Sequence, residues 1–336
     1  MKSILLIANY RPNGGGISQQ VKLLMEHLSL EHVEYDLFNT KGSVLKRLFL
    51  PFRLFLKGFK YDVFHIHTCS DRGFLPALIG IPLGKLLGKS VIVTYHGGGC
   101  ADFFKKYRYP RYFLMHADVN IVLNQYTANV YQKYGIQPLV LHNVVELDQM
   151  QYVNRTQISP RLLSVRHLRP LYNIKTIIEA FGQISKEYPH ATLTILGDGP
   201  DRASLENEVN MRNLTNVTFV GQVPNGEIYE FLKKNDIFVS ASFEDNMPVS
   251  VMEALNAGNV VIASNVGGVP DMIEHRKNGM LFDPNNVDEL VQCVRYVIVH
   301  QDESVKMSSN AHQSAQNYSW DSFWNCYKRL MKNVQV

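Results

Sequence analysis

Short apolar runs alternate with longer amphipathic stretches along the whole chain. Runs of this kind predict buried parallel strands, because helices cover both faces of such a sheet. In the N-terminal part they lie at Ile4–Ala8, Val63–Ile66, Val91–Tyr95 and Val119–Leu123. In the C-terminal part they lie at Arg161–Val165, Ala191–Leu196, Val217–Val220, Ile237–Ser240, Val260–Ala263 and Met280–Phe282. Helical spacing between these runs, as at Asn173–Tyr188, Asn225–Lys234 and 249–257, predicts an α/β protein.

The alternation is interrupted once, by a polar stretch at Glu146–Pro160 that we interpret as a linker. At roughly 100–200 residues per domain, a chain of 336 residues is expected to form two domains. We predict doubly wound, Rossmann-like domains at 1–150 and 151–317, facing each other across a cleft at the carboxyl ends of their strands. Aromatic residues spaced by three and four from Trp320 predict a final helix in 318–336 that packs back on the N-terminal domain.

Composition narrows the class of protein. With 46% hydrophobic and 19% charged residues, the chain is neither disordered nor a coiled coil. A net charge of +4 is too small to indicate a nucleic-acid binder. The four cysteines form no CxxC, and no apolar run has the length of a signal peptide core or a membrane span. We therefore expect a cytoplasmic protein that is soluble or lies on a membrane surface.

Two glycine-rich turns suit anion binding. Pro12-Asn13-Gly14-Gly15-Gly16 follows the first strand and opens a helix, where backbone N–H groups can approach a phosphate, although a tight turn alone would also explain glycines there. The spacing is not the GxGxxG of dinucleotide-binding folds. Gly197-Asp198-Gly199-Pro200 makes a second sharp turn after a strand.

The most informative segment is Ser242–Gly258. It places Glu244 and Asp245 in a loop after a strand, Pro248 at a helix start and Glu253 on that helix. Amides of a first helical turn can receive hydroxyl or phosphate oxygens, and a carboxylate can accept two hydrogen bonds from a diol such as ribose. A paired-acid hydrolase is a rival interpretation, but no residue stands out as its proton donor. Simple charge complementarity with the helix dipole is the other alternative for Asp245.

Four motifs resemble, in their order along the chain, family 4 of the retaining, nucleotide-sugar-dependent glycosyltransferases. They are G-D-G-P, P-x4-E-A, A-G-x-V-V-I-A-S at 257–264 and G-G-V-P-D-x-I at 267–273. Weaker N-terminal matches are Gly14–Gly16, Asp62–His67, Thr94–Gly97 and His142–Asn143. The resemblance implies the GT-B fold. It also implies transfer of a sugar from a nucleotide-diphosphate sugar to a polysaccharide or lipid-linked acceptor, as in bacterial polysaccharide and glycolipid assembly.

The resemblance also implies site residues. Asp245, or Glu244, would orient the transferred sugar, Glu253 would bind the ribose, and His96 would lie near the reacting carbon. Further donor contacts would come from the glycine loop, from the backbone after Asp245, and from turns that border the phosphates and the base: Gly15, Gly16, Gly197, Val220, Asn246, Met247, Pro248 and Val249.

One segment departs from the family pattern. The family commonly has G-R-x4-K-G after the first strand of its second domain, but here His167 stands at the Arg place and Tyr172 at the Lys place. Arg166 or Arg169 would then supply the charge that grips the diphosphate. No D-x-D motif occurs, so we expect electrostatic stabilisation of the leaving group without a metal or other cofactor.

Two further features have more than one interpretation. His65, His67 and Cys69 form H-x-H-x-C, which we interpret as structural histidines in preference to a metal site. Residues 41–60 mix leucine and phenylalanine with cations and contain no acid, and Lys46, Arg47, Arg53 and Lys57 are candidate contacts to an anionic membrane or an acceptor at its inner face. A core helix with a solvated basic edge is the alternative. Nucleic acid fits less well, because apolar residues outnumber the cations.

The sequence thus favours a metal-independent, retaining GT-B glycosyltransferase acting peripherally at the inner face of the cell membrane. A nucleotide-sugar epimerase or hydrolase of the same fold is the first alternative. A catalytically inactive scaffold that keeps the fold is the second, and the residues at 167 and 172 are its best support.

Overall fold

The computed structural model describes residues 2–12, 16–145 and 151–333, and it divides into two compact units. Unit 1 comprises Met1–Val144 and Trp320–Val336, and unit 2 comprises Val145–Ser319. Each is an α/β unit with a six-stranded sheet. This is the fold class that the alternating pattern predicts.

The sheet of unit 1 is parallel, in the order β2-β1-β3-β4-β5-β6. Its strands are β1 (Ile4–Ala8), β2 (Tyr35–Asn39), β3 (Val63–Thr68), β4 (Ser90–Tyr95), β5 (Val119–Val122) and β6 (Leu139–Val140). Its helices are α1 (Ile17–Leu30), α2 (Val44–Leu48), α3 (Leu50–Gly58), η1 (Asp71–Phe74), α4 (Leu75–Leu86), α5 (Cys100–Lys106), α6 (Tyr109–Leu114), α7 (Gln125–Gln132) and α14 (Trp320–Asn333).

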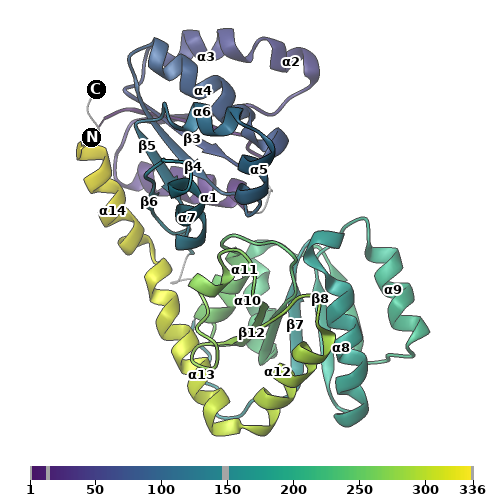
Figure 1. The fold of residues 1–336 in the computed structure, drawn as a ribbon. Helices are drawn as coiled ribbons and strands as arrows, with labels where there is room; N and C mark the ends of the chain where they lie inside the picture. Colours follow the sequence, from purple (N-terminus) through teal and green to yellow (C-terminus); the bar gives the residue numbers. More distant parts are fainter. Residues whose placement is uncertain (1, 13–15, 146–150, 334–336) are drawn as a thin grey trace. The chain divides into compact units, whose positions relative to one another are not determined.

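Alternate side chains of these strands supply two cores, one on each face of the sheet. Leu5, Ile7, Phe64 and Ile66 point into a core shared with α3 to α7. On the other face Ile4, Leu6, Val63 and Ile92 pack against α1 and α14, where Trp324, Tyr327 and Met331 are buried. Thus α14, although distant in sequence, is part of the core of unit 1 (Figure 1).

Unit 2 has a parallel sheet in the order β12-β11-β10-β7-β8-β9. Its strands are β7 (Arg161–Val165), β8 (Thr192–Leu196), β9 (Val217–Gly221), β10 (Ile237–Ser240), β11 (Val260–Ser264) and β12 (Met280–Phe282). Its helices are η3 (Pro170–Tyr172), α8 (Ile174–Glu187), α9 (Arg202–Met211), α10 (Asn225–Lys234), α11 (Val249–Asn256), η4 (Val269–Asp271), α12 (Val287–Val299), α13 (Gln301–Ala315) and η5 (Gln316–Tyr318).

The chain passes from unit 1 to unit 2 between Val144 and Val145. The side chain of Gln20 on α1 donates to the carbonyl of Val144 at 2.8 Å and accepts from its N–H at 2.9 Å. The N–H of Val145 instead donates to the carbonyl of Tyr318 at 3.1 Å. The boundary therefore lies a few residues before the predicted position at 150, while 146–150 lie outside the described residues.

The second half of the predicted linker is an integral part of unit 2. Arg155 is buried and pairs with Asp236 at 3.1 Å. Its guanidinium also donates to the carbonyls of Leu232, Asn235 and Ala257 at 2.7–2.8 Å. A buried guanidinium needs this many hydrogen-bond partners, so polar contacts fix the segment around Arg155. Such contacts give no periodic pattern of hydrophobic residues in the sequence.

Candidate functional site

Arg166, the residue that follows β7, lies at the centre of the candidate donor site in unit 2. Its Nη2 lies 2.5 Å from Oδ2 of Asp245 and 3.1 Å from Oγ of Ser240. The guanidinium carbon lies 5.4 Å from the ring centroid of Tyr172. The side chains of Arg166 and Asp245 are only 11% and 14% exposed, so this charge-assisted pair is shielded from bulk water. The structure thus brings together residues 79 positions apart.

The loop that carries Glu244 and Asp245, called the carboxylate loop below, is held by hydrogen bonds from backbone N–H groups. Oδ1 of Asp245 accepts the N–H of Asn246 at 3.0 Å, and its carbonyl accepts the N–H of Gly268 at 3.2 Å. Gly267 has φ +52°, and a Cβ there would run into that same carbonyl. Only glycine therefore allows the turn after β11 to approach the carboxylate loop this closely.

The turn after β8 supports Arg166 in a similar way. The N–H of Arg166 donates to the carbonyl of Leu196 at 3.0 Å, and Gly197 adopts φ +122° directly against the carbonyl of Arg166. The N–H of Gly197 donates to the carbonyl of Gly221 at 2.8 Å, which brings the end of β9 to the same turn. Val220 precedes that residue and is exposed.

The helix that follows the carboxylate loop begins where the sequence predicts. Pro248 is the N-cap of α11, and its carbonyl accepts the N–H groups of Val251 and Met252 at 3.1 and 3.2 Å. Glu253 is buried on α11. Of the other predicted donor contacts in this segment, Asn246, Met247 and Pro248 are buried and Val249 is half-buried.

Three neighbouring residues that the sequence singles out are exposed, unlike the Arg166–Asp245 pair. Glu244 is exposed, so Asp245 is the acid that meets the arginine. Arg169 is also exposed. His167, at the family's Arg place, is exposed and its Nδ1 is hydrogen-bonded to the carbonyl of Asp198. Of Arg166, His167 and Arg169, Arg166 is therefore the side chain that pairs with Asp245.

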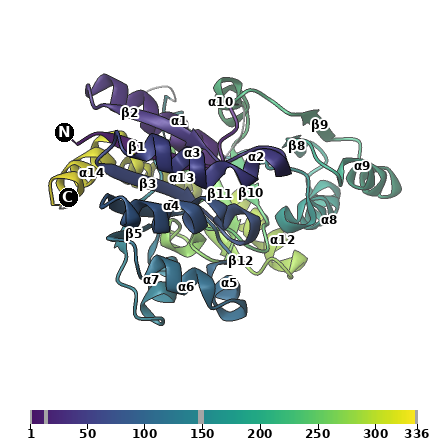
Figure 2. The same ribbon diagram turned by 90° about the horizontal axis from the view of Figure 1, so that it is seen from above.

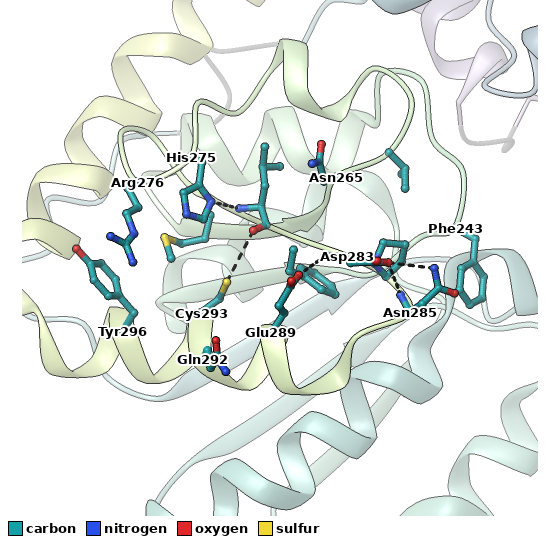
Figure 3. A pocket seen from close by; sticks show the side chains of 15 residues that line it. Phe243, Asn265, His275, Arg276, Asp283, Asn285, Glu289, Gln292, Cys293 and Tyr296 are labelled. Atoms are coloured by element: carbon teal, nitrogen blue, oxygen red, sulfur yellow. Dashed lines mark hydrogen bonds between the residues drawn. The ribbon is translucent and has the colours of Figure 1, made fainter.

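A hollow of unit 2 has none of the predicted donor contacts in its lining. Its volume is about 810 Å³, and it opens between β12, α12 and the loops after β10 and β11. Figure 3 shows His275, Arg276 and Tyr296 at one end and Phe243 with Asn285 at the other. The guanidinium carbon of Arg276 lies over the ring of Tyr296, 4.5 Å from its centroid. Phe243, two residues before Asp245, is the closest link in sequence between this hollow and the carboxylate loop.

In unit 1 the candidate site is a cluster of histidines at the ends of β3 and β4. Nδ1 of His67 lies 3.0 Å from Nε2 of His96. The ring of His65 is tilted against that of His67, with centroids 4.4 Å apart, and its nitrogens are hydrogen-bonded to Oγ1 of Thr94 at 2.8 Å and to the hydroxyl of Tyr327 at 2.9 Å. The hydrogen bond with Tyr327 places α14 directly behind this cluster.

Burial keeps these imidazoles neutral. It lowers the pKa of His96 to about 4, and burial with the neighbouring His96 lowers the pKa of His65 to about 3. The pKa of His67 is also lowered well below its usual value, first by burial and then by the two adjacent histidines. At pH 7 the cluster can therefore donate and accept hydrogen bonds without carrying charge.

A cavity of about 20 Å³ adjoins the cluster, with room for about one water molecule. His65, His67, His96 and His142 line it together with Trp320 and Phe323. Within the described part of the chain, Nε2 of His67 is buried and has no hydrogen-bond partner. Gly16, the N-cap of α1, has φ +55°, whereas the predicted contact Gly15 lies outside the described residues.

Sequence reasoning assigns no binding role to His67 or Ser240, although both contact the candidate sites. The H-x-H spacing is the only signal for His67. Across residues 2–12, 16–145 and 151–333, no three His, Cys, Asp or Glu side chains are grouped as metal ligands would be. Cys69 is half-buried, and its burial raises the pKa of its thiol to about 11. Ser240 ends β10, and nothing in the sequence marks it.

The candidate membrane contacts lie on α2 and α3. Lys46, Arg47 and Arg53 are exposed. Lys57 is half-buried and pairs with Asp36 of β2 at 2.6 Å, and Arg53 lies over the ring of Phe38 at 5.9 Å. No helix among the described residues has the length and apolar character needed to cross a bilayer.

Comparison with known proteins covers nearly the whole chain. Residues 149–314 match the family model described as glycosyl transferases group 1, and residues 14–149 match glycosyltransferase family 4. An uncharacterized glycosyltransferase of Methanocaldococcus jannaschii is 22% identical over 95% of this chain and 94% of its own length.

Other relatives are longer and match in part. The sulfoquinovosyl transferase of Arabidopsis thaliana is 25% identical over 44% of this chain, which spans 29% of that relative. The alpha-monoglucosyldiacylglycerol synthase of Acholeplasma laidlawii is 28% identical over 44% of this chain and 37% of its own length. The chain thus spans less than half the length of these two relatives.

Solved structures agree on the fold. Anabaena HepE, solved in complex with UDP, superposes with a TM-score of 0.81 at 16% identity, covering 99% of this chain and all of that one. The sucrose-phosphate synthase of Thermosynechococcus elongatus superposes with a TM-score of 0.84 at 18% identity, over 99% and 98% of the two chains. With two parallel six-stranded α/β units and both family models matched in order, the chain belongs to the group 1, family 4 glycosyltransferases of GT-B type.

Proposed function

We propose that this protein transfers a sugar from a nucleotide-diphosphate sugar to a hydroxyl group of a glycan or a lipid-linked acceptor, with retention of anomeric configuration and without a metal ion. The observation that carries the proposal is the shielded Arg166–Asp245 pair after β7 and β10, which is held by glycine turns after β8 and β11. Ligands of open parallel sheets bind at this edge.

The chemistry of the pair suits a diphosphate donor. Arg166 presents a guanidinium that can grip two phosphate oxygens, and its orientation is already fixed by Ser240, Asp245 and Tyr172. Because these contacts exist before the donor binds, little reorganisation is needed when charge develops on the leaving group. Asp245 would accept hydrogen bonds from sugar hydroxyls, and Glu253 would accept those of the ribose.

For the transfer step we propose a front-face displacement. The bond between the anomeric carbon and the phosphate oxygen breaks while the acceptor oxygen bonds to the same carbon from the same side. The acceptor proton passes to the departing phosphate oxygen, so no enzyme nucleophile is needed. In unit 1, His96 would hold a sugar hydroxyl as a neutral hydrogen-bonding group, consistent with its lowered pKa.

For the acceptor we propose a glycan or a lipid-linked sugar at the inner face of the cell membrane. The names of relatives support this class, since the Acholeplasma relative is an alpha-monoglucosyldiacylglycerol synthase. The exposed cations of α2 and α3 would favour an anionic membrane surface as a partner.

The decisive test begins with the donor. Nucleotide sugars are screened for an increase in melting temperature, and the best one is incubated with lipid-linked and soluble sugar acceptors. We expect an α-linked product from an α-linked donor and full activity in the presence of a chelator. A β-linked product would disprove retention, and loss of turnover with the chelator would disprove metal independence.

One specific observation favours a second candidate, an inactive GT-B protein that binds without turnover. Tyr172 occupies the place of the family's lysine and stacks on Arg166, whose charge is already paired with Asp245. A donor that raises the melting temperature but is never consumed, with any acceptor offered, would support this candidate over the transferase.

A further inference from the structure

Helices α2 and α3 expose large apolar side chains at the surface of unit 1. Leu48, Phe49, Phe52, Leu56 and Phe59 are each between 55% and 70% exposed, and together they form the α2–α3 ridge. From Phe49 onward they are spaced by three and four residues, so they lie along one face of α3. Figures 1 and 2 show both helices at the surface of unit 1, with α3 beside α4.

The opposite face of α3 is fixed in the core. Leu50 and Leu54 are buried in the cluster that includes Phe64. A Cβ added to Gly58 would lie 2.5 Å from the ring of Phe64 and 2.8 Å from Leu87, so the helix backbone rests directly on these side chains. Because each residue turns the helix by about 100°, Leu50, Leu54 and Gly58 point away from the ridge. Helix α3 is therefore fixed in the fold and cannot rotate to bury the side chains of the ridge.

This geometry excludes the interpretation of α3 as an ordinary core helix with a solvated basic edge. Such a helix presents polar residues opposite its buried face, whereas α3 presents phenylalanine and leucine there. Contiguous exposed apolar side chains on a folded protein mark a surface that binds something.

The segment that carries the ridge has charges of a single sign. Residues 41–60 contain six Lys or Arg and no Asp or Glu. Lys46, Arg47, Arg53 and Lys60 are exposed, whereas Lys57 is partly neutralised by Asp36. At the far end, Nζ of Lys89 donates to the carbonyl of Phe59 at 3.2 Å and adds another cation.

We propose that the α2–α3 ridge docks on an anionic lipid bilayer, with its phenylalanine and leucine side chains among the headgroups and its cations against the lipid phosphates. Charge complementarity favours this occupant, because two positively charged ridges from separate copies would repel each other. The proposal deepens the proposed function by naming the surface that meets the membrane, and it rests on that function only for the presence of a membrane-bound acceptor.

The test compares two triple variants by co-sedimentation with vesicles of phosphatidylcholine containing about one third phosphatidylglycerol. F49S/F52S/L56S removes three ridge side chains. L30S/M211S/V299S removes three equally exposed apolar side chains that lie on other helices. We expect the first variant to lose at least about tenfold in vesicle affinity and the second to match the unmodified protein. Binding of the unmodified protein should weaken on pure phosphatidylcholine.

Several outcomes would overturn the proposal. Equal vesicle binding by both triple variants would show that the ridge is not the contact. Equal binding to neutral and anionic vesicles would show that charge does not matter. In sedimentation velocity without lipid, self-association of the unmodified protein that is lost in F49S/F52S/L56S would assign the ridge to a second copy of the chain.

The result is independent of the donor site. Both triple variants are also tested for melting-temperature increase with the nucleotide sugar, which the ridge substitutions should leave unchanged. If no nucleotide sugar stabilises any form while ridge-dependent vesicle binding persists, the proposed transfer fails and the membrane surface stands. Stabilisation by donor without ridge-dependent vesicle binding would instead disprove the membrane surface and leave the proposed transfer intact.

Discussion

Arg166 in unit 2 and the histidine cluster in unit 1 solve the problem of a shielded polar group in opposite ways. Arg166 keeps its charge and is matched by a carboxylate at 2.5 Å, a hydroxyl and an aromatic face. The histidines lose their charge, since burial lowers their pKa values, and each has a ring nitrogen hydrogen-bonded to another histidine, to Thr94 or to Tyr327. The first arrangement suits a charged ligand and the second a neutral one. The proposed binding of a diphosphate by Arg166 and of a sugar hydroxyl by His96 rests on this contrast.

The largest expected effect is acid destabilisation of unit 1. Its buried histidines have folded-state pKa values below the ordinary 6.5, to about 3 for His65 and about 4 for His96, so the unfolded state binds more protons below pH 6.5. Stability is therefore full above pH 6.5 and falls as the pH drops toward 4, by about 1.4 kcal/mol per pH unit for each histidine.

Hydrogen exchange between pH 7 and 4.5 measures the loss of stability separately in the two units. Protection should fall first in β3 and β4, ahead of β7 and β10. Histidine NMR titration supplies the control, because His96 should remain neutral down to about pH 4. Titration of His96 near its ordinary value, or earlier loss of protection in unit 2, would contradict the contrast.

The next effect concerns the charged site. Arg166→Ala removes the oriented guanidinium and leaves Asp245 without its cation, so we expect kcat/KM for the nucleotide sugar to fall by about 10²–10³-fold. Arg169→Ala is the matched control, because that side chain is exposed, and it should cost less than about threefold. Similar losses in both variants would show that orientation by Ser240 and Asp245 is irrelevant.

His96→Ala should act on turnover more than on binding. Loss of a neutral hydrogen-bonding group at the reacting sugar is expected to lower kcat by about 10²-fold, with donor affinity by calorimetry nearly unchanged. Glu253→Ala should show the opposite pattern, with weaker nucleotide binding as the main effect. Identical patterns in the two variants would show that these roles are assigned wrongly.

The smallest effect tests the glycine turn behind Asp245. Gly267→Ala forces a Cβ against the carbonyl of Asp245 at φ +52°, and we expect a loss of about 1–3 kcal/mol in stability with weaker donor binding. Gly226→Ala, where a Cβ meets nothing within 4 Å, is the control and should be neutral or slightly stabilising. Thermal unfolding with and without donor distinguishes the two. An unchanged stability of Gly267→Ala would show that the turn can move away from the carbonyl of Asp245.

Periodicity predicts most strands because parallel sheets bury nearly continuous apolar runs. Arg161–Val165, Ile237–Ser240 and Met280–Phe282 are strands with the predicted bounds. The pattern fails at β2, where Tyr35-Asp36-Leu37-Phe38-Asn39 mixes polar and apolar residues at the edge of a sheet. Edge strands are covered less completely than central ones, so their sequences carry a weaker signal.

The site is less accessible to sequence reasoning than the fold. Motif resemblance points to the carboxylate loop, but the choice of Asp245 over Glu244 and of Arg166 over Arg169 depends on which side chains meet across two strands. The hydrogen bond between His65 and Tyr327 joins residues 262 positions apart. Contacts between residues so far apart in the sequence leave no local sequence pattern. They can be identified only once the positions of the strands and α14 in the fold are known.

The hydrogen bond from the N–H of Val145 to the carbonyl of Tyr318 decides which fragments of the chain can be produced separately. Because the two ends of unit 2 meet at this bond, 145–319 is an insertion within unit 1 and can be excised as one piece with adjoining termini. A fragment ending at Val144 would instead lack α14, whose Trp324, Tyr327 and Met331 share a core with Ile4 and Leu6. Joining 144 to 320 through a short linker is therefore the natural way to produce unit 1 by itself.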